Sequence, residues 1–469
     1  MGIPGTYYVS AEGSQLWSRE QLNELIRSLD PTLHSFTYTY PPPRFALCHS
    51  SQGGLASESF SMWPDASFYL HIPFCRMNCN FCSLHRRLIR SDEEVTLYVA
   101  ALMHELQIAH DNGIALPLAA LYIGGGTPTV LGAESLNAIL DQVASIAIVS
   151  SHNEVETTIE CAPDTSCSAE DWQQFFVPLV GREKLPITRV SIGLQAWDDG
   201  VLRRMGRSGT KNAIIELLTV VEQLAQAYNI DFILGYPNNN QEPAAEGASI
   251  LDAVRELRHR GFSLPSVSVY QLWDVESIPA TRNRVRRLSS SYKIAEALWL
   301  VQDGMYAMGY SPGAGTTFIS GPKYVHKWTV HRCREFRHLG FGSGSYSFLP
   351  DGFVQRRRDI AGYTSTLSAR QQSWETVDRS LNAVFRMTSE DATIRRTILG
   401  LRSGIPVGLG PETSRVAELC DKMRRLREVG ILEYRADTVS LRPQAFLLTN
   451  AISAFLHPSA VPRKAASVD

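Results

Sequence analysis

The stretch from Phe68 to Cys82 decides the fold of this chain, and it reads Phe-Tyr-Leu-His-Ile-Pro-Phe-Cys-Arg-Met-Asn-Cys-Asn-Phe-Cys. Its first half is typical of a short apolar strand. The strand leads directly into a loop with three cysteines at CxxxCxxC spacing, Cys75, Cys79 and Cys82. A cubane [4Fe–4S] cluster usually takes four thiolates, so three would leave one iron open to bind and react with a ligand. The carboxyl end of a strand is also where α/β barrels carry their chemistry.

Zinc is the alternative for three cysteines. It is usually bound by four nitrogen or sulfur ligands, most often supplied as CxxC pairs, and His85 would have to be the fourth ligand here. The spacing and the preceding strand favour the iron–sulfur cluster.

The composition is that of an ordinary globular protein, with 469 residues, 44% of them hydrophobic and 20% charged. The 45 basic and 47 acidic side chains give a net charge of −2, so bulk electrostatics favour neither nucleic acid nor a membrane surface. The basic run Arg282–Arg287 is local, and a solvated surface explains it more simply than an RNA-binding patch.

We expect a cytoplasmic protein. No secretion signal follows Met1, and no apolar run reaches the roughly 18 residues of a membrane span. The eight cysteines are sparse and irregular outside the loop, unlike those of a disulfide scaffold.

Hydrophobic patterning alternates between strands and helices from Ser67 to about residue 320, which predicts βαβ units and a parallel sheet. We expect an α/β fold built on a partial (β/α)6 barrel, TIM-like but open on one side so that a large substrate can enter. The predicted strands are Ser67–Ile72, Leu118–Ile123, Glu156–Glu160, Arg189–Leu194, Ile230–Leu234 and Pro265–Tyr270. The predicted helices between them are Glu93–Gln107, Ala133–Ala147, Lys211–Ala227 and Ile250–Arg260.

The N-terminal extension contains one predicted helix, Ser18–Ser28, and a segment rich in tyrosine and proline, Thr37–Arg44. It either packs as an arm or folds over the active site as a lid. Near the C-terminus, helices at Thr393–Arg402 and Thr413–Arg427 and a short hairpin predict a winged-helix-like cap on the barrel. The expected units are the extension (1–65), the barrel core with its C-terminal extension (66–355), the helical C-terminal unit (356–457) and a disordered tail (458–469).

A glycine-rich turn, Gly124-Gly125-Gly126-Thr127, follows the second predicted strand. Three glycines at a strand end expose backbone groups to a ligand, although a tight strand-to-helix turn explains them equally well. The turn matches neither the G-x-G-x-x-G nor the G-K-S/T phosphate pattern, which excludes a Rossmann or P-loop site. Beside the cysteine loop, it is expected to hold the amine of an amino acid-like group bound to the open iron.

Polar residues lie at or near the ends of three more predicted strands. Glu160 closes the third strand and Gln195 follows the fourth, where barrels place functional groups. Asp231, near the amino end of the fifth predicted strand, is equally consistent with a capping role. Arg207 lies in a predicted turn, where it either clamps a carboxylate bidentately or is an ordinary surface arginine.

Together these segments resemble the radical S-adenosylmethionine (SAM) superfamily, and within it the branch of oxygen-independent coproporphyrinogen III oxidase. The resemblance implies that the three loop cysteines ligate a [4Fe–4S] cluster whose open iron chelates SAM. Reductive cleavage of SAM would then yield a 5′-deoxyadenosyl radical that abstracts a substrate hydrogen. The resemblance runs from about residue 66 to 350, through Tyr69–Cys82, Gly124–Thr129, Glu160–Pro163, Ser191–Gln195, Asp231–Pro237 and Leu339–Gly344.

The resemblance also implies the SAM contacts. The first SAM would lie on Tyr69, Gly125, Glu160 and Tyr346. This branch can hold a second SAM, which would lie on Phe81, Gly126, Thr127, Gln195, Arg207, Asp231 and Trp273. Tyr69, Glu160 and Arg207 are the candidate catalytic residues.

Three departures from the branch bear on the substrate. The oxidase carries an extra cysteine two residues beyond the last cluster ligand, where this chain has Leu84. A small residue is typical where Trp273 stands. The segment Thr39-Tyr40-Pro41-Pro42 resembles arms of relatives that act in secondary metabolism.

Three functions are compatible with the resemblance, besides other radical chemistries such as haem ring opening. The first is two-SAM one-carbon transfer, methylation or cyclopropanation, in which a SAM-derived methylene radical adds to an sp² carbon of a conjugated natural product. The second is radical oxidative decarboxylation of porphyrinogen propionates. The third is a haem chaperone, because His326-Lys327-Trp328 partly matches the motif of a haem-carrying relative. We expect a small-molecule substrate, a reductase or flavodoxin-type electron donor, and a monomer.

Overall fold

The computed structural model describes residues 51–52, 63–149, 155–236, 242–272, 291–334, 337–350, 352–368 and 382–458. The predicted N-terminal helix and arm, the basic run, Trp273 and the tail after Pro458 lie outside these residues. The lid, arm and tail therefore stay predictions.

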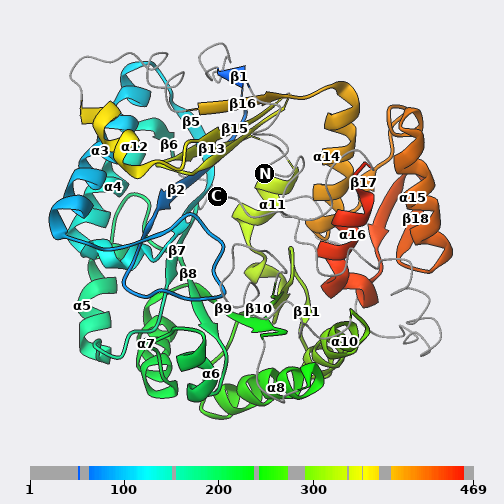
Figure 1. Ribbon diagram of the computed structural model, residues 1–469, viewed down its shortest axis with the longest axis horizontal. Helices are drawn as coiled ribbons and strands as arrows, with labels where there is room; N and C mark the ends of the chain where they lie inside the picture. The colour runs from blue at the N-terminus through cyan, green and yellow to red at the C-terminus, as the bar shows by residue number, and fades with distance from the viewer. Residues whose placement is uncertain are drawn as a thin grey trace.

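Six parallel strands form the centre of the molecule, as the strand–helix alternation predicts (Figure 1). Each strand pairs in parallel with the next one along the chain, because a helix returns the chain to the same edge of the sheet after every strand. The prediction of a partial (β/α)6 barrel is confirmed. The strands are β2 (Ala66–Ile72), β5 (Leu116–Gly125), β7 (Glu156–Cys161), β8 (Arg189–Gln195), β9 (Ala227–Leu234) and β10 (Ser266–Gln271).

Helices cover the outer face of these strands, with α3, α4, α5 and α7 following one another down the left of Figure 1 and α8 and α10 along its bottom. Alternate strand residues such as Ile159, Ile192 and Phe232 are fully buried against this layer. Ser91 and Ser168 cap the first turns of α3 and α5 through their hydroxyl oxygens. The helices of the barrel are α3 (Asp92–Asp111), α4 (Gly132–Ile146), α5 (Ala169–Val180), α6 (Asp199–Arg204), α7 (Lys211–Leu224), α8 (Pro243–His259) and α10 (Ser291–Ala307).

The sheet continues beyond the six strands at both edges. After β10 come β12 (Thr317–Ile319) and β11 (Ser311–Pro312), both antiparallel to their neighbours. On the other side, β13 (His338–Phe341) pairs in parallel with β2. It is followed by antiparallel β14 (Tyr346–Leu349), β15 (Gly352–Arg356), β16 (Asn382–Arg386) and β1 (Ser51–Gln52). Within the described ranges the two edges do not pair with each other, so the barrel is open as expected.

A second group of elements follows the sheet. Thr388 caps α14 through a capping box with Asp391, and a single 3-10 turn at Thr413–Arg415 precedes α15. The large sheet extends past residue 355, where we expect the C-terminal unit to begin, so the division into units stays a prediction. The group consists of α14 (Ser389–Arg402), α15 (Ala417–Glu428), α16 (Thr449–Leu456) and a three-stranded sheet of β17 (Val407–Gly408), β19 (Thr438–Leu441) and β18 (Leu432–Arg435).

Helix α11 (Lys327–Arg334) lies between the barrel strands and this C-terminal group (Figure 1). It contacts β2 and β5 on one side and α14 on the other. The helix therefore closes the barrel interior on the side where the strands leave a gap. A further helix, α12 (Ile360–Ser368), packs on α3.

A buried ion pair joins α3 to the strands beyond β13. Glu105 is fully buried, and its Oε1 lies 2.6 Å from Nη2 of Arg356. Its Oε2 accepts hydrogen bonds from the Tyr363 hydroxyl at 2.6 Å and from the Gly342 backbone N–H at 2.9 Å. This one carboxylate therefore holds α12, β15 and the turn after β13 on the barrel.

We expect Glu105→Gln to lower the free energy of unfolding by about 3–5 kcal/mol, because it leaves the Arg356 charge buried beside a neutral side chain. The measurement is a urea titration of both proteins. Asp252→Asn is the matched control, because it removes a carboxylate from a solvent-exposed pair with Arg255 at 2.8 Å and should cost less than about 1 kcal/mol. Equal losses in the two variants would contradict the anchoring role.

Candidate active site

The candidate site lies inside the barrel, on the strand residues that alternate with the apolar outer ones. Neighbouring strand residues point to opposite faces, so the polar residues that alternate with the buried outward residues point inward. Such residues line the interior on β7 to β10; they are Thr158, Glu160, Arg189, Ser191, Asn229, Asp231, Ser266 and Ser268.

The cysteine loop is closed at its base. The short strands β3 (Phe74–Cys75) and β4 (Arg87–Leu88) pair in parallel at the two ends of the loop. Inside the loop, Arg86 Nη2 donates a hydrogen bond to the Cys79 carbonyl at 2.7 Å. These contacts fix the path of the loop backbone.

The tip of the loop is held by the turn after α6. The Asn80 N–H donates to the Met205 carbonyl at 3.0 Å, and its side-chain amide donates to the Arg204 carbonyl at 2.6 Å. Gly206 has φ +78°, and a Cβ there would lie 2.6 Å from the Asn78 carbonyl oxygen. Only glycine allows this approach, so the turn can pack against the loop only with glycine at position 206.

The three thiols lie on the barrel side of the loop. Cys75 and Cys79 are buried and Cys82 is half-buried. The Thr127 hydroxyl lies 3.7 Å from Cys75 Sγ, and Arg207 Nη1 lies 3.9 Å from Cys79 Sγ. Burial raises the pKa of Cys75 to about 11 and also raises that of Cys82. Metal coordination would have to displace these protons.

The thiols suit a cluster better than a single ion. In the part of the chain that the structure describes, no three His, Cys, Asp or Glu side chains converge closely enough to hold one metal ion. His85, the fourth ligand that zinc would need, instead stacks on His71 with ring centroids 5.5 Å apart and bonds the Ser343 hydroxyl at 3.2 Å. A cubane gives each cysteine its own iron, so its ligands need not converge on one point. The donor set fits the cluster.

The glycine turn at the end of β5 packs tightly on its neighbours. Gly125 has φ +114°, and a Cβ there would lie 2.5 Å from the His71 ring. A Cβ on Gly124 would lie 2.8 Å from the Glu160 carboxyl carbon, and one on Gly126 would overlap the Phe74 carbonyl oxygen. Close packing alone therefore requires all three glycines, and it also keeps their backbone groups near the thiols.

Glu160, next to last in β7, is tied to β5. The Tyr122 hydroxyl donates to its Oε1 at 2.7 Å, and the Gly125 N–H donates to its Oε2 at 2.9 Å. Burial raises the pKa of Glu160, and these two hydrogen bonds oppose that rise. The carboxyl is thus held in one orientation beside the glycine turn.

Asp231 lies in the middle of β9, and the prediction that it sits at the amino end of its strand is wrong. β9 begins at Ala227, three residues before the predicted start, because the polar Asn229 points inward and breaks the apolar pattern without ending the strand. Asn229 Nδ2 donates to Asp231 Oδ1 at 2.6 Å, and the Ser191 hydroxyl donates to Oδ2 at 3.3 Å. Burial, followed by the Glu160 charge, raises the pKa of Asp231 to about 7. The side chain belongs to the site and caps nothing.

Gln195 and Arg207 meet at an irregularity in β8. The register with β9 shifts between Gly193 and Gln195, and Gln195 has φ +74°, a rare conformation for a residue other than glycine. Arg207 donates from Nη2 to the Gly193 carbonyl, while its Nη1 faces Cys79 Sγ. Arg207 therefore points into the site, and the alternative of an ordinary surface arginine is wrong. Bulges and strained residues of this kind cluster at functional sites.

Two adjoining cavities occupy the barrel interior. One, the cluster-side cavity, has about 1300 Å³ of empty space with its mouth included, and it is lined by the three thiols and by Phe81, Gly126, Thr127, Gln195, Arg207 and Asp231. The other, the inner cavity, has about 1330 Å³ and is lined by Tyr69 and Tyr346 among others. Gly125 and Glu160 line both, as do Leu84, Tyr122, Ser191 and Tyr270. All the described candidate residues thus border one continuous space, and Trp273 lies outside the described residues.

Several residues of this space were missed from the sequence. Tyr122 separates the two cavities, its hydroxyl on Glu160 and its ring 4.5 Å from that of Trp328. His71 was also missed; its Nδ1 shares a hydrogen bond of 3.0 Å with the hydroxyl of Tyr69, which was predicted. The signal for Ser191 was present, because it alternates with the buried Val190 and Ile192 on a predicted strand, whereas Asn229 lies just before the predicted strand Ile230–Leu234. Trp328 was noted only within the partial motif His326-Lys327-Trp328, and its place in the cavity depends on the tertiary fold, which brings α11 to the interior.

Comparison with known proteins agrees with this site. A model of the radical SAM superfamily matches residues 69–250. The heme chaperone HemW of Haemophilus influenzae is 30% identical over 306 residues, which are 62% of this chain and 73% of that protein. The oxygen-independent coproporphyrinogen III oxidase of Bradyrhizobium diazoefficiens is 25% identical over 322 residues, 65% of this chain and 67% of that one.

The solved structure of coproporphyrinogen III oxidase (HemN) from Escherichia coli, a radical SAM enzyme, aligns with a TM-score of 0.70. The alignment covers 90% of this chain and 96% of that one at 18% identity. At this identity the likeness shows the fold alone, and it confirms the predicted class of barrel.

The chain belongs to the radical SAM superfamily. Its relatives within the superfamily are coproporphyrinogen III oxidase and HemW, which confirms the branch that the motifs predict. Membership implies a [4Fe–4S] cluster and SAM, whereas the number of SAM molecules, the electron donor and the monomeric state stay predictions. No helix among the described residues is both long and apolar enough to cross a bilayer.

We expect Cys79→Ala to abolish cluster loading, because two thiolates cannot retain the cubane. The measurement is iron and sulfide content per chain after anaerobic reconstitution, together with the brown absorbance of the cluster. Cys420→Ala is the control, since Cys420 lies on α15, outside the cysteine loop, and its thiol donates to the Thr413 carbonyl at 3.2 Å. Wild-type iron content in Cys79→Ala would refute the assignment of the loop.

The raised pKa of Asp231 predicts a dependence of stability on pH. Between the ordinary value of 3.8 and about 7, the folded chain binds this proton more tightly than the unfolded chain does. The contribution of Asp231 to stability therefore falls as pH rises through that window. Asp231→Asn, which cannot titrate, should remove this part of the decline in urea titrations at several pH values. Wild-type and variant curves that stay parallel would contradict the raised pKa.

Proposed function

We propose that this chain is a radical SAM enzyme that holds two SAM molecules and transfers one carbon to an sp² carbon of a conjugated small molecule. The observation that carries the proposal is the division of the barrel interior into two adjoining cavities that share Tyr122 and Glu160.

The residues of the cluster-side cavity suit the cluster and SAM. Cys75, Cys79 and Cys82 would hold the cluster, which when bound supplies the electron for reductive cleavage of SAM. Arg207, beside Cys79, would bind a carboxylate through the edge of its guanidinium, the geometry that a second SAM offers. The first SAM would reach from the thiols of the cluster-side cavity past Glu160, which lines both cavities, to Tyr69 in the inner cavity.

The inner cavity suits the conjugated small molecule that would accept the carbon. Its walls carry the rings of Tyr69, Tyr122 and Trp328, with centroid distances of 6.0 Å between the first two and 4.5 Å between the last two. Aromatic faces favour flat conjugated ligands. Tyr122 stands between such a ligand and the thiols, so the reacting carbon would lie at the junction beside Glu160.

Oxidative decarboxylation of a porphyrinogen is the second candidate. It is the activity named for two relatives, from Bradyrhizobium diazoefficiens and Cereibacter sphaeroides, at 25% and 28% identity. Leu84, in place of the oxidase's extra cysteine, lines both cavities and is 47% exposed. An apolar side chain at the junction favours an apolar ligand there, so we place this candidate second.

A haem chaperone is the third candidate, because the relative from Haemophilus influenzae carries that name at 30% identity. In the partial motif His326-Lys327-Trp328, His326 is the side chain that would ligate haem iron. Both of its ring nitrogens already have partners, the Thr329 hydroxyl at 2.8 Å from Nδ1 and the Thr158 hydroxyl at 3.4 Å from Nε2. A haem iron would have to displace one of them, which disfavours this candidate.

A labelling experiment separates the three candidates without knowledge of the acceptor. The reconstituted protein is incubated anaerobically with dithionite and SAM deuterated at its methyl group. Two-SAM chemistry predicts deuterium in the 5′-deoxyadenosine product, since the abstracted hydrogen comes from the second SAM. Unlabelled 5′-deoxyadenosine with carbon dioxide from coproporphyrinogen would favour the oxidase and overturn the proposal. Negligible cleavage with tight haem binding would favour the chaperone.

Arg207→Ala should reduce SAM binding from two molecules per chain to one while leaving iron content unchanged. The reason is that Arg207 lines the cluster-side cavity, where the second carboxylate is proposed to bind. Equilibrium dialysis with labelled SAM measures the stoichiometry, and Arg203→Ala, an exposed arginine on α6, is the control. If Arg207→Ala still binds two SAM molecules at wild-type affinity, Arg207 does not hold the second carboxylate, and the two-SAM model is contradicted at this residue.

A further inference from the structure

The junction of the two cavities has a carboxylate at its centre. The residues that line both cavities are Leu84, Tyr122, Gly125, Glu160, Ser191 and Tyr270. Glu160 is the carboxylate of this set, and Tyr122 is the side chain that bonds it. The way in which Tyr122 holds Glu160 therefore decides what kind of group the junction can bind.

The register of the sheet brings Tyr122 and Glu160 together. Tyr122 on β5 pairs with Thr158 on β7, and Glu160 lies two residues further along the same face of β7. Gly124 lies two residues beyond Tyr122, and a Cβ there would lie 2.6 Å from the Tyr122 ring and 2.9 Å from Glu160 Oε1. The lack of a side chain at position 124 is therefore what lets the phenol and the carboxylate meet.

The ring of Tyr122 packs against three other rings. Its centroid lies 4.5 Å from that of Trp328, 5.5 Å from that of His326 and 6.0 Å from that of Tyr69. These neighbours come from α11, from the residue just before it and from β2. The packing keeps the hydroxyl of Tyr122 in one place beside the carboxyl group.

The hydrogen bond between Tyr122 and Glu160 has a defined direction. Burial, followed by the Glu160 charge, raises the pKa of Tyr122 well above its ordinary value, so the phenol keeps its proton. Among the described residues, Glu160 Oε1 at 2.7 Å is the hydrogen-bond partner of this hydroxyl, so the hydroxyl donates to the carboxyl group. The Gly125 N–H, which can only donate, lies 2.9 Å from Oε2. Both carboxyl oxygens therefore accept, which favours the ionised form.

Burial opposes this ionised form. It is the largest of the causes that act on Glu160 and raises its pKa, whereas the Tyr122 hydroxyl is the larger of the two causes that lower it. An ionised carboxylate has about four acceptor positions, and Tyr122 and Gly125 occupy one on each oxygen. The remaining positions are free to accept from a ligand.

We propose that Tyr122 is a positioning residue, whose hydroxyl keeps Glu160 ionised and in one orientation so that its free acceptor positions receive the ammonium or hydroxyl groups of the first SAM. The part that concerns SAM rests on the proposed function, which takes the first SAM past Glu160. The state of Glu160 rests on its contacts with Tyr122 and Gly125.

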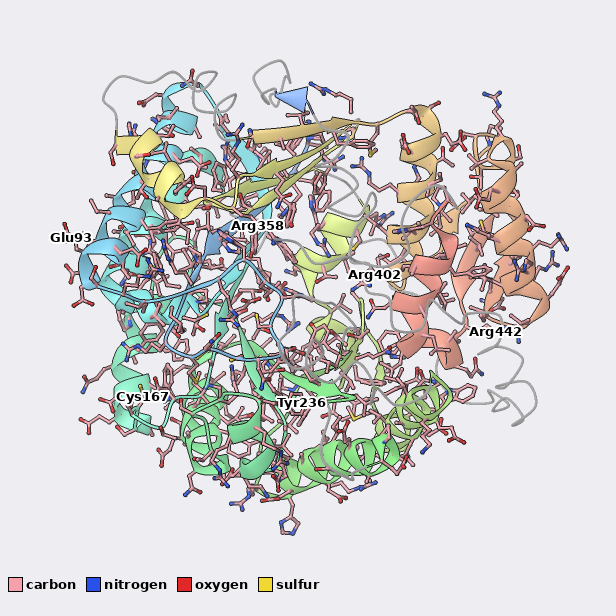
Figure 2. All side chains as sticks on the ribbon, viewed as in Figure 1. Glu93, Cys167, Tyr236, Arg358, Arg402 and Arg442 are labelled. Atoms are coloured by element: carbon pink, nitrogen blue, oxygen red, sulfur yellow. The ribbon has the colours of Figure 1, made fainter. Side chains whose placement is uncertain are left out.

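Other charged or titratable groups share this space. Asp231 on β9 and Tyr270 on β10 each have a pKa that is raised in part by the Glu160 charge. Arginines also line the cavities, among them Arg207 beside the thiols and, as Figure 2 labels them, Arg358 on the side of the strands and Arg402 on the side of the C-terminal helices. The experiment therefore has to isolate the titration of Glu160 from all of these groups.

The first test is a double-mutant cycle on the reconstituted protein without SAM. Tyr122→Phe keeps the ring and removes the donor, so the pKa of Glu160 should rise further. A carboxyl group with a raised pKa loses its contribution to stability as pH rises from its ordinary value of 4.5 to its value in the folded chain. In urea titrations, the free energy of unfolding of Tyr122→Phe should therefore fall increasingly below that of the wild type as pH rises. In the Glu160→Gln background, where position 160 cannot titrate, the effect of Tyr122→Phe should be the same at every pH.

Tyr310→Phe is the matched control, because the buried Tyr310 hydroxyl donates to the Leu264 backbone carbonyl at 2.9 Å and not to a carboxylate. Its effect on stability should not change with pH. An effect of Tyr122→Phe that is equal at every pH, or that keeps its pH dependence in the Glu160→Gln background, would overturn the proposal. A Tyr122→Phe protein that does not fold by circular dichroism would show a structural role and would overturn it too.

The second test measures SAM binding to the same proteins by equilibrium dialysis. Tyr122→Phe should weaken SAM binding roughly three- to ten-fold, because a hydrogen bond to a neutral carboxyl group is weaker than one to a carboxylate. The loss should shrink at higher pH, where Glu160 is ionised again, and Tyr310→Phe should bind as the wild type does. Unchanged SAM affinity together with a positive double-mutant cycle would support the hold of Tyr122 on Glu160 and contradict the place given to the first SAM. A negative cycle together with deuterium in the 5′-deoxyadenosine of the labelling experiment would overturn the role of Tyr122 and leave the proposed function standing.

Discussion

The close packing of the glycine turn against the start of the cysteine loop is the constraint on which the rest of this structure depends. The Gly126 N–H donates to the Ile72 carbonyl at 2.7 Å, and the Thr127 N–H donates to the Phe74 carbonyl at 2.8 Å. Any side chain on Gly125 would strike the His71 ring. Because the same turn donates to Glu160, it sets the spacing between the thiols, the carboxylate and the junction of the two cavities.

The barrel separates packing from chemistry by the pleat of its strands. Outward residues such as Ile192 and Phe232 are fully buried against the helices and supply the apolar stabilisation. Inward residues do not pack against the helices, so they can be polar. A partial barrel leaves one flank uncovered, and here α11 and the C-terminal group cover it. On that flank the interior is therefore bordered by helices, whereas on the others it is bordered by strands.

Charge is distributed unevenly along that interior. Glu160 and Asp231 stand near the thiols, and burial raises the pKa of each. Four arginines, Arg189, Arg332, Arg358 and Arg402, line the inner cavity. The two cavities therefore differ in the charged side chains that line them.

The sequence by itself determined the six parallel strands, the cysteine loop and the glycine turn, because periodicity and spacing are local properties that each segment carries in full. It misplaced Asp231, since an inward polar residue looks like a strand end when the pocket it faces is unknown. It did not reveal Arg332 or Arg402 as cavity residues, and it pointed to Trp328 only through the partial motif His326-Lys327-Trp328; these side chains reach the cavity from α11 and α14. Only the tertiary structure could decide that those helices fill the open flank, because their contacts join residues that lie far apart in the chain.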